Sequence, residues 1–171
     1  MTENRDVRYV DTGSATRTEI EAERMDEEFG IEISRAGIGL GARILELGYA
    51  HAHFLVWATA EGCNFVGTEI NRGLHEAATA AGHDVHLGPL DDIDFATGTA
   101  FDAIAAFDVF EHLTISGLKE TLIRLHGLLA EGGVGFGWFP NGGSPFGLAF
   151  IAGDIAHKTT LNGSSMEQFG A

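Results

Sequence analysis

The sequence is poor in two kinds of residue, and each shortage excludes a class of protein. It contains one cysteine, Cys63, so no disulfide can form within the chain, and a reducing cytoplasm is the expected compartment. It contains 10 lysine and arginine residues against 25 aspartate and glutamate residues, a formal net charge of -15. An average field of that sign repels phosphate backbones and anionic lipid surfaces, so we expect no nucleic-acid partner.

Long apolar runs are also absent. No stretch approaches the roughly 18 uninterrupted apolar residues that a membrane-spanning helix requires. The first residues, Met-Thr-Glu-Asn-Arg-Asp, lack the basic and then apolar order of a secretory signal. We therefore expect a soluble, cytoplasmic protein with no membrane partner. Its 171 residues, 44% of them hydrophobic, suit a single compact core.

Hydrophobic periodicity predicts strands that alternate with helices along most of the chain. Apolar runs typical of buried strands occupy residues 42–47, 64–69, 84–87, 101–107 and 133–139. Helical spacing of apolar residues occurs at 53–60, 73–81 and 117–129. This alternation predicts an α/β fold with a doubly wound, mainly parallel sheet of five strands and helices on both faces. In such sheets the binding crevice lies at the carboxyl ends of the strands, where the strand order reverses.

The N-terminal part of the chain is predicted to lie outside the α/β domain. Residues 1–36 are predicted to form an N-terminal arm followed by an acidic helix, which runs from Arg17 to Phe29 and ends at Gly30. Residues 37–171 make up the α/β domain. Within it, Ser164 to Phe169 has the composition of a helix that is just beginning.

The loop after the first predicted strand has the small residues that a nucleoside cofactor requires. Gly48 permits a tight turn and a close approach of the backbone. Ala50 and Ala52 keep the loop nearly as slim, and we expect their φ angles to be negative. Glu69 follows Glu46 by 23 residues and ends the second strand, where an acid can accept hydrogen bonds from both hydroxyls of a ribose.

Several motifs in the same order carry a family resemblance. They are Ile44-Leu-Glu-Leu-Gly48, Val66-Gly-Thr-Glu-Ile70, Phe101-Asp-Ala-Ile-Ala-Ala-Phe-Asp-Val-Phe-Glu-His-Leu113, Leu128-Leu-Ala-Glu-Gly-Gly133 and Pro140-Asn141. Together they resemble the class I S-adenosylmethionine-dependent methyltransferases, over roughly residues 40 to 145. The combination is more specific than any single motif in it.

The resemblance implies a cofactor and a set of residues that contact it. In that family the first loop wraps the methionine part of S-adenosylmethionine, and the acid after the second strand holds the ribose. The loop after the third strand cups the adenine, and the segment after the fourth strand faces the methyl group. Carried over, the resemblance implicates Glu46, Gly48, Tyr49, Ala50, Glu69, Ile70, Leu90, Asp91, Phe107 and Asp108.

Under the same resemblance, three roles stay open for Asp108, Glu111 and His112, which follow the fourth strand. They can hold a divalent cation, His112 can act as a general base, or the side chains can form local hydrogen bonds only. We take His112 as the candidate catalytic residue and expect no bound metal. His51 and His53 have no third ligand within reach in the sequence, so we expect them to face solvent.

The chain also departs from the family pattern. Ala50 and Ala52 stand where glycines are usual, and Pro89 stands where an acid often contacts the adenine. A positive φ at either alanine would cost about 1 to 3 kcal/mol and weaken cofactor binding. Family members usually continue with another helix and two more strands. We therefore expect a C-terminally truncated domain that can self-associate through the exposed edge of its strand at 133–139.

The function that these features predict is methyl transfer from S-adenosylmethionine to a small-molecule acceptor, achieved mainly by positioning the acceptor. The alternative is a catalytically weak or inactive methyltransferase-like domain that acts as a binding or subunit partner. A nicotinamide-dependent dehydrogenase is disfavoured, because the Gly-x-Gly-x-x-Gly glycines of such enzymes are missing.

Overall fold

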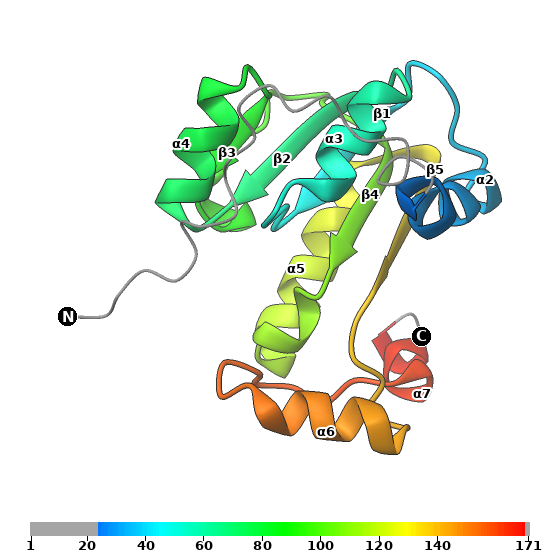
Figure 1. Cartoon of the computed structure of the whole chain (residues 1–171), viewed down its shortest axis with the longest axis vertical. Helices are drawn as coiled ribbons and strands as arrows, with labels where there is room; N and C mark the ends of the chain where they lie inside the picture. The colour runs from blue at the N-terminus through cyan, green and yellow to red at the C-terminus, as the bar shows by residue number, and fades with distance from the viewer. Residues whose placement is uncertain (1–23, 170–171) are drawn as a thin grey trace. The chain divides into compact units, whose positions relative to one another are not determined.

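The computed structural model describes residues 24–169, which form two compact units. The first unit comprises the described residues up to Ala105 together with Leu129–Phe136, and the second comprises Ala106–Leu128 with the described residues from Gly137 onward. Figure 1 labels the helices and strands of both units. The arm predicted for residues 1–16 lies outside the described residues. No helix within residues 24–169 is long and apolar enough to cross a membrane.

The sheet contains the five parallel strands that the apolar runs predict. They are β1 (Arg43–Leu47), β2 (Asn64–Glu69), β3 (Val85–Leu87), β4 (Phe101–Phe107) and β5 (Leu129–Trp138). Their order in the sheet is β3-β2-β1-β4-β5 (Figure 1). The order reverses at β1, and in doubly wound folds ligands bind at the carboxyl ends of the strands at such a reversal. The predicted fold class is therefore confirmed.

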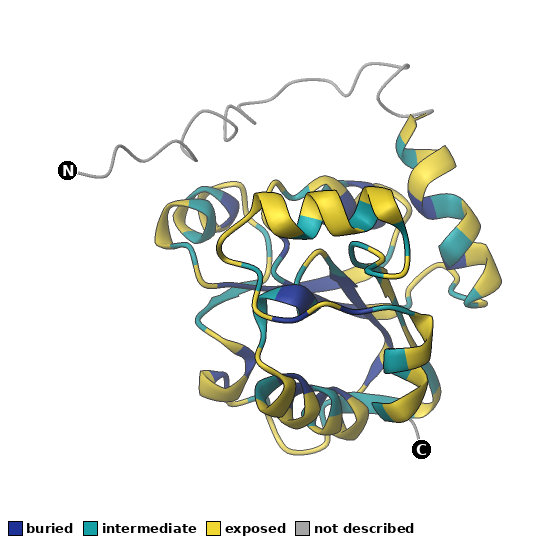
Figure 2. Ribbon diagram, turned by 90° about the horizontal axis from the view of Figure 1, so that it is seen from below, coloured by how far each residue is buried: buried dark blue, intermediate teal, exposed yellow. Residues whose placement is uncertain are grey.

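Strand β1 is the centre of the core of the first unit. It pairs with β2 so that Leu45 lies opposite Val66. Helix α3 (His53–Ala60) packs on β2, and α4 (Arg72–Ala80) packs on β2 and β3. Strands β1, β2 and β4 are buried along almost their whole length, while the helices expose one side (Figure 2). Burial of these three strands on both faces of the sheet explains why continuous apolar runs predict them.

An aromatic cluster fixes α3 against its surroundings within the first unit. The ring of Phe54 lies 5.1 Å from that of Phe29, 5.9 Å from that of Trp57, 6.3 Å from that of Phe65 and 5.8 Å from that of Phe136. Phe54 is 2% exposed. Edge-to-face and offset arrangements at these distances stabilise the core beyond the burial of apolar area. The helix that follows the loop after β1 is thereby held in place.

The acidic helix predicted to end at Gly30 continues past it. The π-helical segment η2 (Asp26–Gly30) runs directly into α2 (Ile31–Arg35), and Gly30 has helical angles of φ -60° and ψ -35°. The reason is tertiary packing, because Phe29 and Ile33 lie four residues apart and are both buried. The turn comes later, at Gly37, where φ is 68°. The part of the predicted helix before residue 24 lies outside the described residues.

The second unit contains the short η4 (Phe110–His112) and the helices α5 (Ile115–Leu128), α6 (Pro145–Gly153) and α7 (Gly163–Phe169). Helix α7 confirms the helix expected from Ser164 onward, and α6 was not predicted. Its sequence is apolar almost all round and contains two glycines, so it has no helical periodicity. Strand β5 begins at Leu129, four residues before the predicted start, and, apart from the acidic helix, the other boundaries agree or differ by at most two residues.

Candidate functional site

The loop after β1 turns sharply through three residues of left-handed backbone. The φ angles are 62° at Gly48, 41° at Ala50 and 61° at Ala52. The expectation of negative φ at the two alanines was therefore wrong. Hydrogen bonds supply the physical reason, because the backbone N–H groups of Gly48 and Tyr49 donate to the carbonyl of Thr68 at 2.9 and 3.3 Å. These bonds hold the loop against the end of β2, so the chain has to change direction sharply before α3 begins.

Glu69, at the end of β2, ties this loop to the start of α4. One carboxylate oxygen accepts a hydrogen bond from the backbone N–H of Ala50 at 3.0 Å, and the other accepts from the N–H of Asn71 at 2.8 Å. Glu69 is 6% exposed. Each carboxylate oxygen has a second lone pair. The side chain therefore has capacity left for ribose hydroxyls, and its predicted contact with the cofactor stays a prediction.

Glu46 and Tyr49 bring two buried polar atoms to the same place. Neither Oε2 of Glu46 nor the hydroxyl of Tyr49 has a hydrogen-bond partner within the described residues. Both side chains are buried, at 3% exposure each. Burial, together with the charge of Glu69, raises the pKa of Glu46 well above its usual value and also raises the pKa of Tyr49. Buried polar groups are nearly always hydrogen-bonded, so these two atoms have hydrogen-bonding capacity that the described residues leave unused.

These groups fit the cofactor that the resemblance implies. The side-chain oxygens of Glu46 and Glu69 can accept hydrogen bonds from the hydroxyl and ammonium donors of such a molecule, and Tyr49 adds a phenol. The slim left-handed loop brings backbone close to the same point. The first unit thus gathers four of the predicted contact residues, Glu46, Tyr49, Ala50 and Glu69, around the ends of β1 and β2.

The remaining predicted contacts of the first unit flank this group. The N–H of Gly88 donates to the carbonyl of Glu69 at 2.9 Å, which places the following turn, η3 (Leu90–Asp92), beside the end of β2. Leu90 is buried and Asp91 is exposed. Ile70 is 75% exposed. The structure therefore brings the loop after β3 to the group and leaves the side chain of Ile70 in solvent.

Phe107 and Asp108 belong to the second unit. The ring of Phe107 lies 4.0 Å from that of Trp138, and the N–H of Asp108 donates to the carbonyl of Trp138 at 3.0 Å. Asp108 has a positive φ of 52°. Burial raises its pKa, while a hydrogen bond from the Trp138 side chain and the nearby His112 and His157 act in the opposite direction.

A second group of polar side chains, the acid–histidine cluster, consists of Glu111, His112 and His157 in the second unit. The backbone N–H groups of Lys158 and Thr159 donate to the carbonyl of Glu111 at 2.7 and 3.1 Å. These bonds lay the segment around His157 along η4. The rings of His112 and His157 are then 4.8 Å apart. Burial raises the pKa of Glu111.

Sequence reasoning identified Glu111 and His112 but missed His157. The available signal was weak, an acid three residues before a histidine at Asp154 and His157. Only the backbone pairing with η4 makes this histidine part of the cluster.

Comparisons with known proteins identify the family and the fold of the chain. A model of the methyltransferase domain family matches residues 21–140. A comparison with curated protein sequences finds no match. The fold is similar to that of an S-adenosylmethionine-dependent methyltransferase from Archaeoglobus fulgidus, with a TM-score of 0.67, 18% identity, and coverage of 86% of this chain and 66% of that one.

Two further solved structures show the same fold. Coclaurine N-methyltransferase bound to N-methylheliamine and SAH is similar with a TM-score of 0.53 and 20% identity, over 73% of this chain and 37% of that chain. An S-adenosylmethionine-dependent methyltransferase from Clostridium acetobutylicum is similar with a TM-score of 0.58 and 16% identity, over 70% and 51% of the two chains. The chain thus spans between about a third and two thirds of the length of these proteins. It belongs to the methyltransferase domain family and has the Rossmann-like fold of the class I S-adenosylmethionine-dependent methyltransferases.

Proposed function

We propose that the chain binds S-adenosylmethionine at the ends of β1 and β2 and transfers its methyl group to a small-molecule acceptor. The observation that carries the proposal is the buried Glu46, whose Oε2 has no hydrogen-bond partner in residues 24–169 and which lies in the field of Glu69. A cofactor with a positive charge and ribose hydroxyls satisfies both acids. When bound, S-adenosylmethionine supplies an electrophilic methyl group on a sulfonium.

The residues of the first unit divide the binding between them. Glu69 accepts hydrogen bonds from the ribose hydroxyls, and its existing bond to Ala50 keeps the carboxylate oriented. Glu46 and Tyr49 interact with the polar groups of the methionine part. The loop backbone and the first turn of α3 present N–H groups to its carboxylate. Leu90 adds an apolar wall at the turn after β3.

Methyl transfer depends mainly on how the acceptor is positioned against the methyl group. Displacement at a sulfonium needs the attacking atom held close and in line, and placement of this kind supplies about 7 to 11 kcal/mol of the barrier. An oxygen or nitrogen acceptor also loses a proton, which requires a base or a Lewis acid. His112 is the candidate base that the sequence suggests, but the rings of His112 and His157 lie 4.8 Å apart beside Glu111, an arrangement that favours a different role.

The alternative is a domain that binds cofactor weakly and serves as a subunit partner. The left-handed Ala50 and Ala52 support it, because each such conformation costs an L-residue about 1 to 2 kcal/mol. Strain of that size makes the loop costly to hold in this shape, and a loop that leaves this shape no longer contacts the cofactor in the same way. The partner of such a domain would be a protein, whereas the enzyme needs only small molecules.

Calorimetry with S-adenosylhomocysteine separates the two functions. We expect wild type to bind one molecule, and Glu69→Ala to weaken binding by about 1.5 to 3 kcal/mol, the value of charge-assisted hydrogen bonds. Glu76→Ala, which removes an exposed acid on α4, serves as the control and should bind as wild type does. Circular dichroism and a Glu69→Gln variant separate lost contacts from lost folding.

The outcomes are distinct. No binding by folded wild type would overturn the enzyme and favour the subunit-partner function. Equal affinities of wild type and folded Glu69→Ala would remove Glu69 from the site without deciding the function.

A further inference from the structure

The acid–histidine cluster of the second unit has the composition and spacing of a metal site. Glu111, His112 and His157 each offer one ligand atom, and these atoms all lie within 4.8 Å of one another. The three side chains come from two segments, η4 and the loop after α6, which the backbone bonds to the Glu111 carbonyl hold together. None of them belongs to the group around Glu46 and Glu69 in the first unit.

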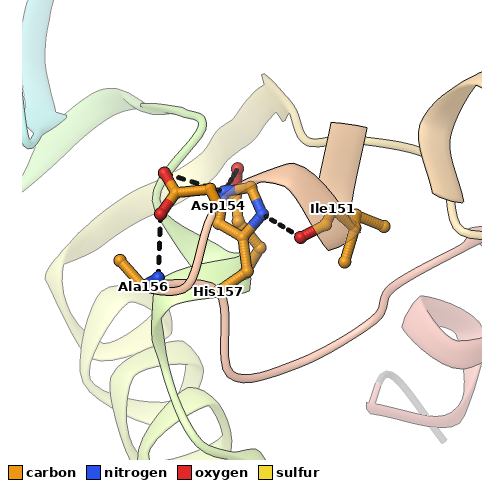
Figure 3. A network of polar contacts seen from close by, with 5 residues as sticks. Ile151, Asp154, Ala156 and His157 are labelled. Atoms are coloured by element: carbon orange, nitrogen blue, oxygen red, sulfur yellow. Dashed lines mark hydrogen bonds and ion pairs between the residues drawn. The ribbon is translucent and has the colours of Figure 1, made fainter. Parts of the chain in front are cut away.

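In the tautomer of His157 that the structure favours, the unprotonated nitrogen Nε2 faces Glu111 in the cluster. Its Nδ1 lies 3.1 Å from the carbonyl of Ile151, and because a carbonyl only accepts, Nδ1 carries the proton. Nε2 of the neutral ring is then an acceptor. It lies 3.8 Å from Oδ2 of Asp154 (Figure 3). It also lies 3.9 Å from Oε1 of Glu111. These distances are too long for hydrogen bonds.

The carboxyl group of Glu111 is buried without the hydrogen bonds that usually stabilise such a group. It is 1% exposed, and neither carboxylate oxygen has a hydrogen-bond partner within the described residues. A buried carboxylate without such partners is costly, since nothing replaces the water it loses. A cation held between Glu111 and His157 would remove this cost.

We propose that Glu111, His112 and His157 bind a divalent transition-metal ion, of which Zn²⁺ is the representative. Two imidazoles with one carboxylate favour zinc and its neighbours, whereas Mg²⁺ and Ca²⁺ prefer sets made of oxygen. Ligand atoms at about 2.0 to 2.2 Å from zinc are about 3.4 Å apart at a tetrahedral angle. The cluster therefore closes on the ion by side-chain movements of about an ångström, which rotamer adjustments supply.

The surroundings support ligation in two ways. The hydrogen bond from Nδ1 of His157 to Ile151 is the outer contact that orients a metal-ligating imidazole (Figure 3). The side chain of Asp154 is 50% exposed and oriented by the N–H of Ala156 at 2.8 Å, so it forms a rim that is open to solvent. An ion can enter there, and three protein ligands leave at least one coordination position for water or another oxygen.

The metal site changes the role of His112. An imidazole whose lone pair ligates a cation cannot also take a proton, so His112 would act as a ligand and not as a general base. The proposal also departs from the expectation, drawn from the sequence, that the chain holds no metal. It does not rest on methyl transfer, because metal binding can be measured with no cofactor present.

Calorimetric titration of chelator-treated protein with Zn²⁺ tests the proposal. We expect wild type to bind one ion with micromolar or tighter affinity, and Mg²⁺ to give no saturable heat. Glu111→Gln and His157→Asn should each weaken zinc binding at least tenfold. His126→Asn, which changes an exposed histidine on α5, is the matched control and should bind as wild type does. Equal affinity in all four folded proteins would overturn the site.

A second measurement needs no variant and remains decisive where Glu111→Gln fails to fold. Crystals of the wild-type chain soaked in Zn²⁺ give an anomalous signal at the zinc absorption edge. A peak bounded by Glu111, His112 and His157 supports the proposal. A peak only elsewhere, for example at His51 and His53, whose rings lie 6.1 Å apart, would overturn it, as would no peak at all.

Discussion

Ala50, Ala52 and Asp108 are the three non-glycine residues of the described chain that have a positive φ. Each lies where a ligand is proposed: the two alanines in the loop after β1, and Asp108 beside the acid–histidine cluster. Backbone in this region costs an L-residue free energy and persists only where the surroundings impose it. At both places hydrogen bonds to a neighbouring strand impose it, through Thr68 and Trp138.

Replacing both alanines by glycine should stabilise the fold. Relief of two left-handed conformations gains about 1 to 2 kcal/mol each, and the added freedom of two glycines in the unfolded chain costs about 0.5 to 1 kcal/mol each. We expect the free energy of unfolding of the Ala50→Gly, Ala52→Gly protein to rise by about 1 to 2 kcal/mol in urea denaturation. Ala80→Gly, at an exposed position at the end of α4, should lower it by up to about 1 kcal/mol. A fall in the loop variant would contradict the assigned strain.

Glu46 makes the stability of the chain depend on pH. Burial raises its pKa in the folded state well above the usual 4.5, so the folded state holds the proton over a pH range in which the unfolded chain has lost it. The favourable contribution is complete below pH 4.5 and is lost as the pH rises through the folded-state pKa. Neutral glutamine in Glu46→Gln does not titrate.

The expected signature is a stability difference that grows with pH. Urea denaturation at several pH values above 4.5 should show Glu46→Gln gaining stability over wild type until the folded-state pKa is passed. Glu120→Gln, which changes an exposed acid on α5, should give a nearly constant difference. A constant difference for Glu46→Gln as well would mean that Glu46 is ionised in both states throughout this range.

Among the elements, α4 depends on a single capping residue. The side-chain oxygen of Asn71 accepts hydrogen bonds from the N–H groups of Gly73 at 2.9 Å and Leu74 at 3.2 Å. The backbone N–H of the same residue donates to Glu69. Asn71 therefore contacts both the N-terminus of α4 and Glu69, the acid proposed to bind the ribose.

Removing this cap should cost about 1 kcal/mol of stability, because two N–H groups at the start of α4 lose their acceptor. We expect Asn71→Ala to unfold at a lower urea concentration with an unchanged slope, while Asn71→Ser, which retains a capping oxygen, unfolds close to wild type. Ala and Ser variants of equal stability would show that water satisfies these N–H groups as well as the side chain does.

The elements also show how far periodicity predicts structure. Strands β2 and β4 and helix α3 have the predicted bounds, because each begins and ends where an apolar run meets a glycine, a charge or a turn. Helix α6 was not predicted because its segment is almost uniformly apolar, so its apolar residues show no helical periodicity. Its start was nevertheless signalled by Ser144, whose hydroxyl accepts from the N–H of Gly147 at 3.2 Å, and by Pro145 at the first position.

On the scale of the whole molecule, the edge of the sheet favours association of two copies of the chain, and the net charge opposes it. Strand β5 ends the sheet order and has β4 as its one neighbour within the described residues. Unpaired N–H and C=O groups along an edge strand favour pairing with a second copy. A net charge of -15 opposes that approach, but salt screens exposed charges beyond roughly 8 Å at physiological ionic strength.

We therefore expect this chain to associate more strongly as salt increases. Sedimentation equilibrium at low and physiological salt should show species above 18.2 kDa, with a larger share at the higher salt. A homogeneous 18.2 kDa species at both salt concentrations and at several protein concentrations would show that the edge of β5 does not pair.

The sequence by itself determined the order of strands and helices and the family. It also determined that Glu46, Gly48 and Glu69 lie at strand ends. The physical reason is that buried strands and helices each require a recognisable spacing of apolar residues. Tertiary structure alone decided three other features. It placed Ala50 in left-handed backbone, since hydrogen bonds to Thr68 outweigh the local preference of alanine. It extended the acidic helix beyond Gly30. It also brought His157 to Glu111 through backbone bonds between segments far apart in the chain, a pairing that no local pattern encodes.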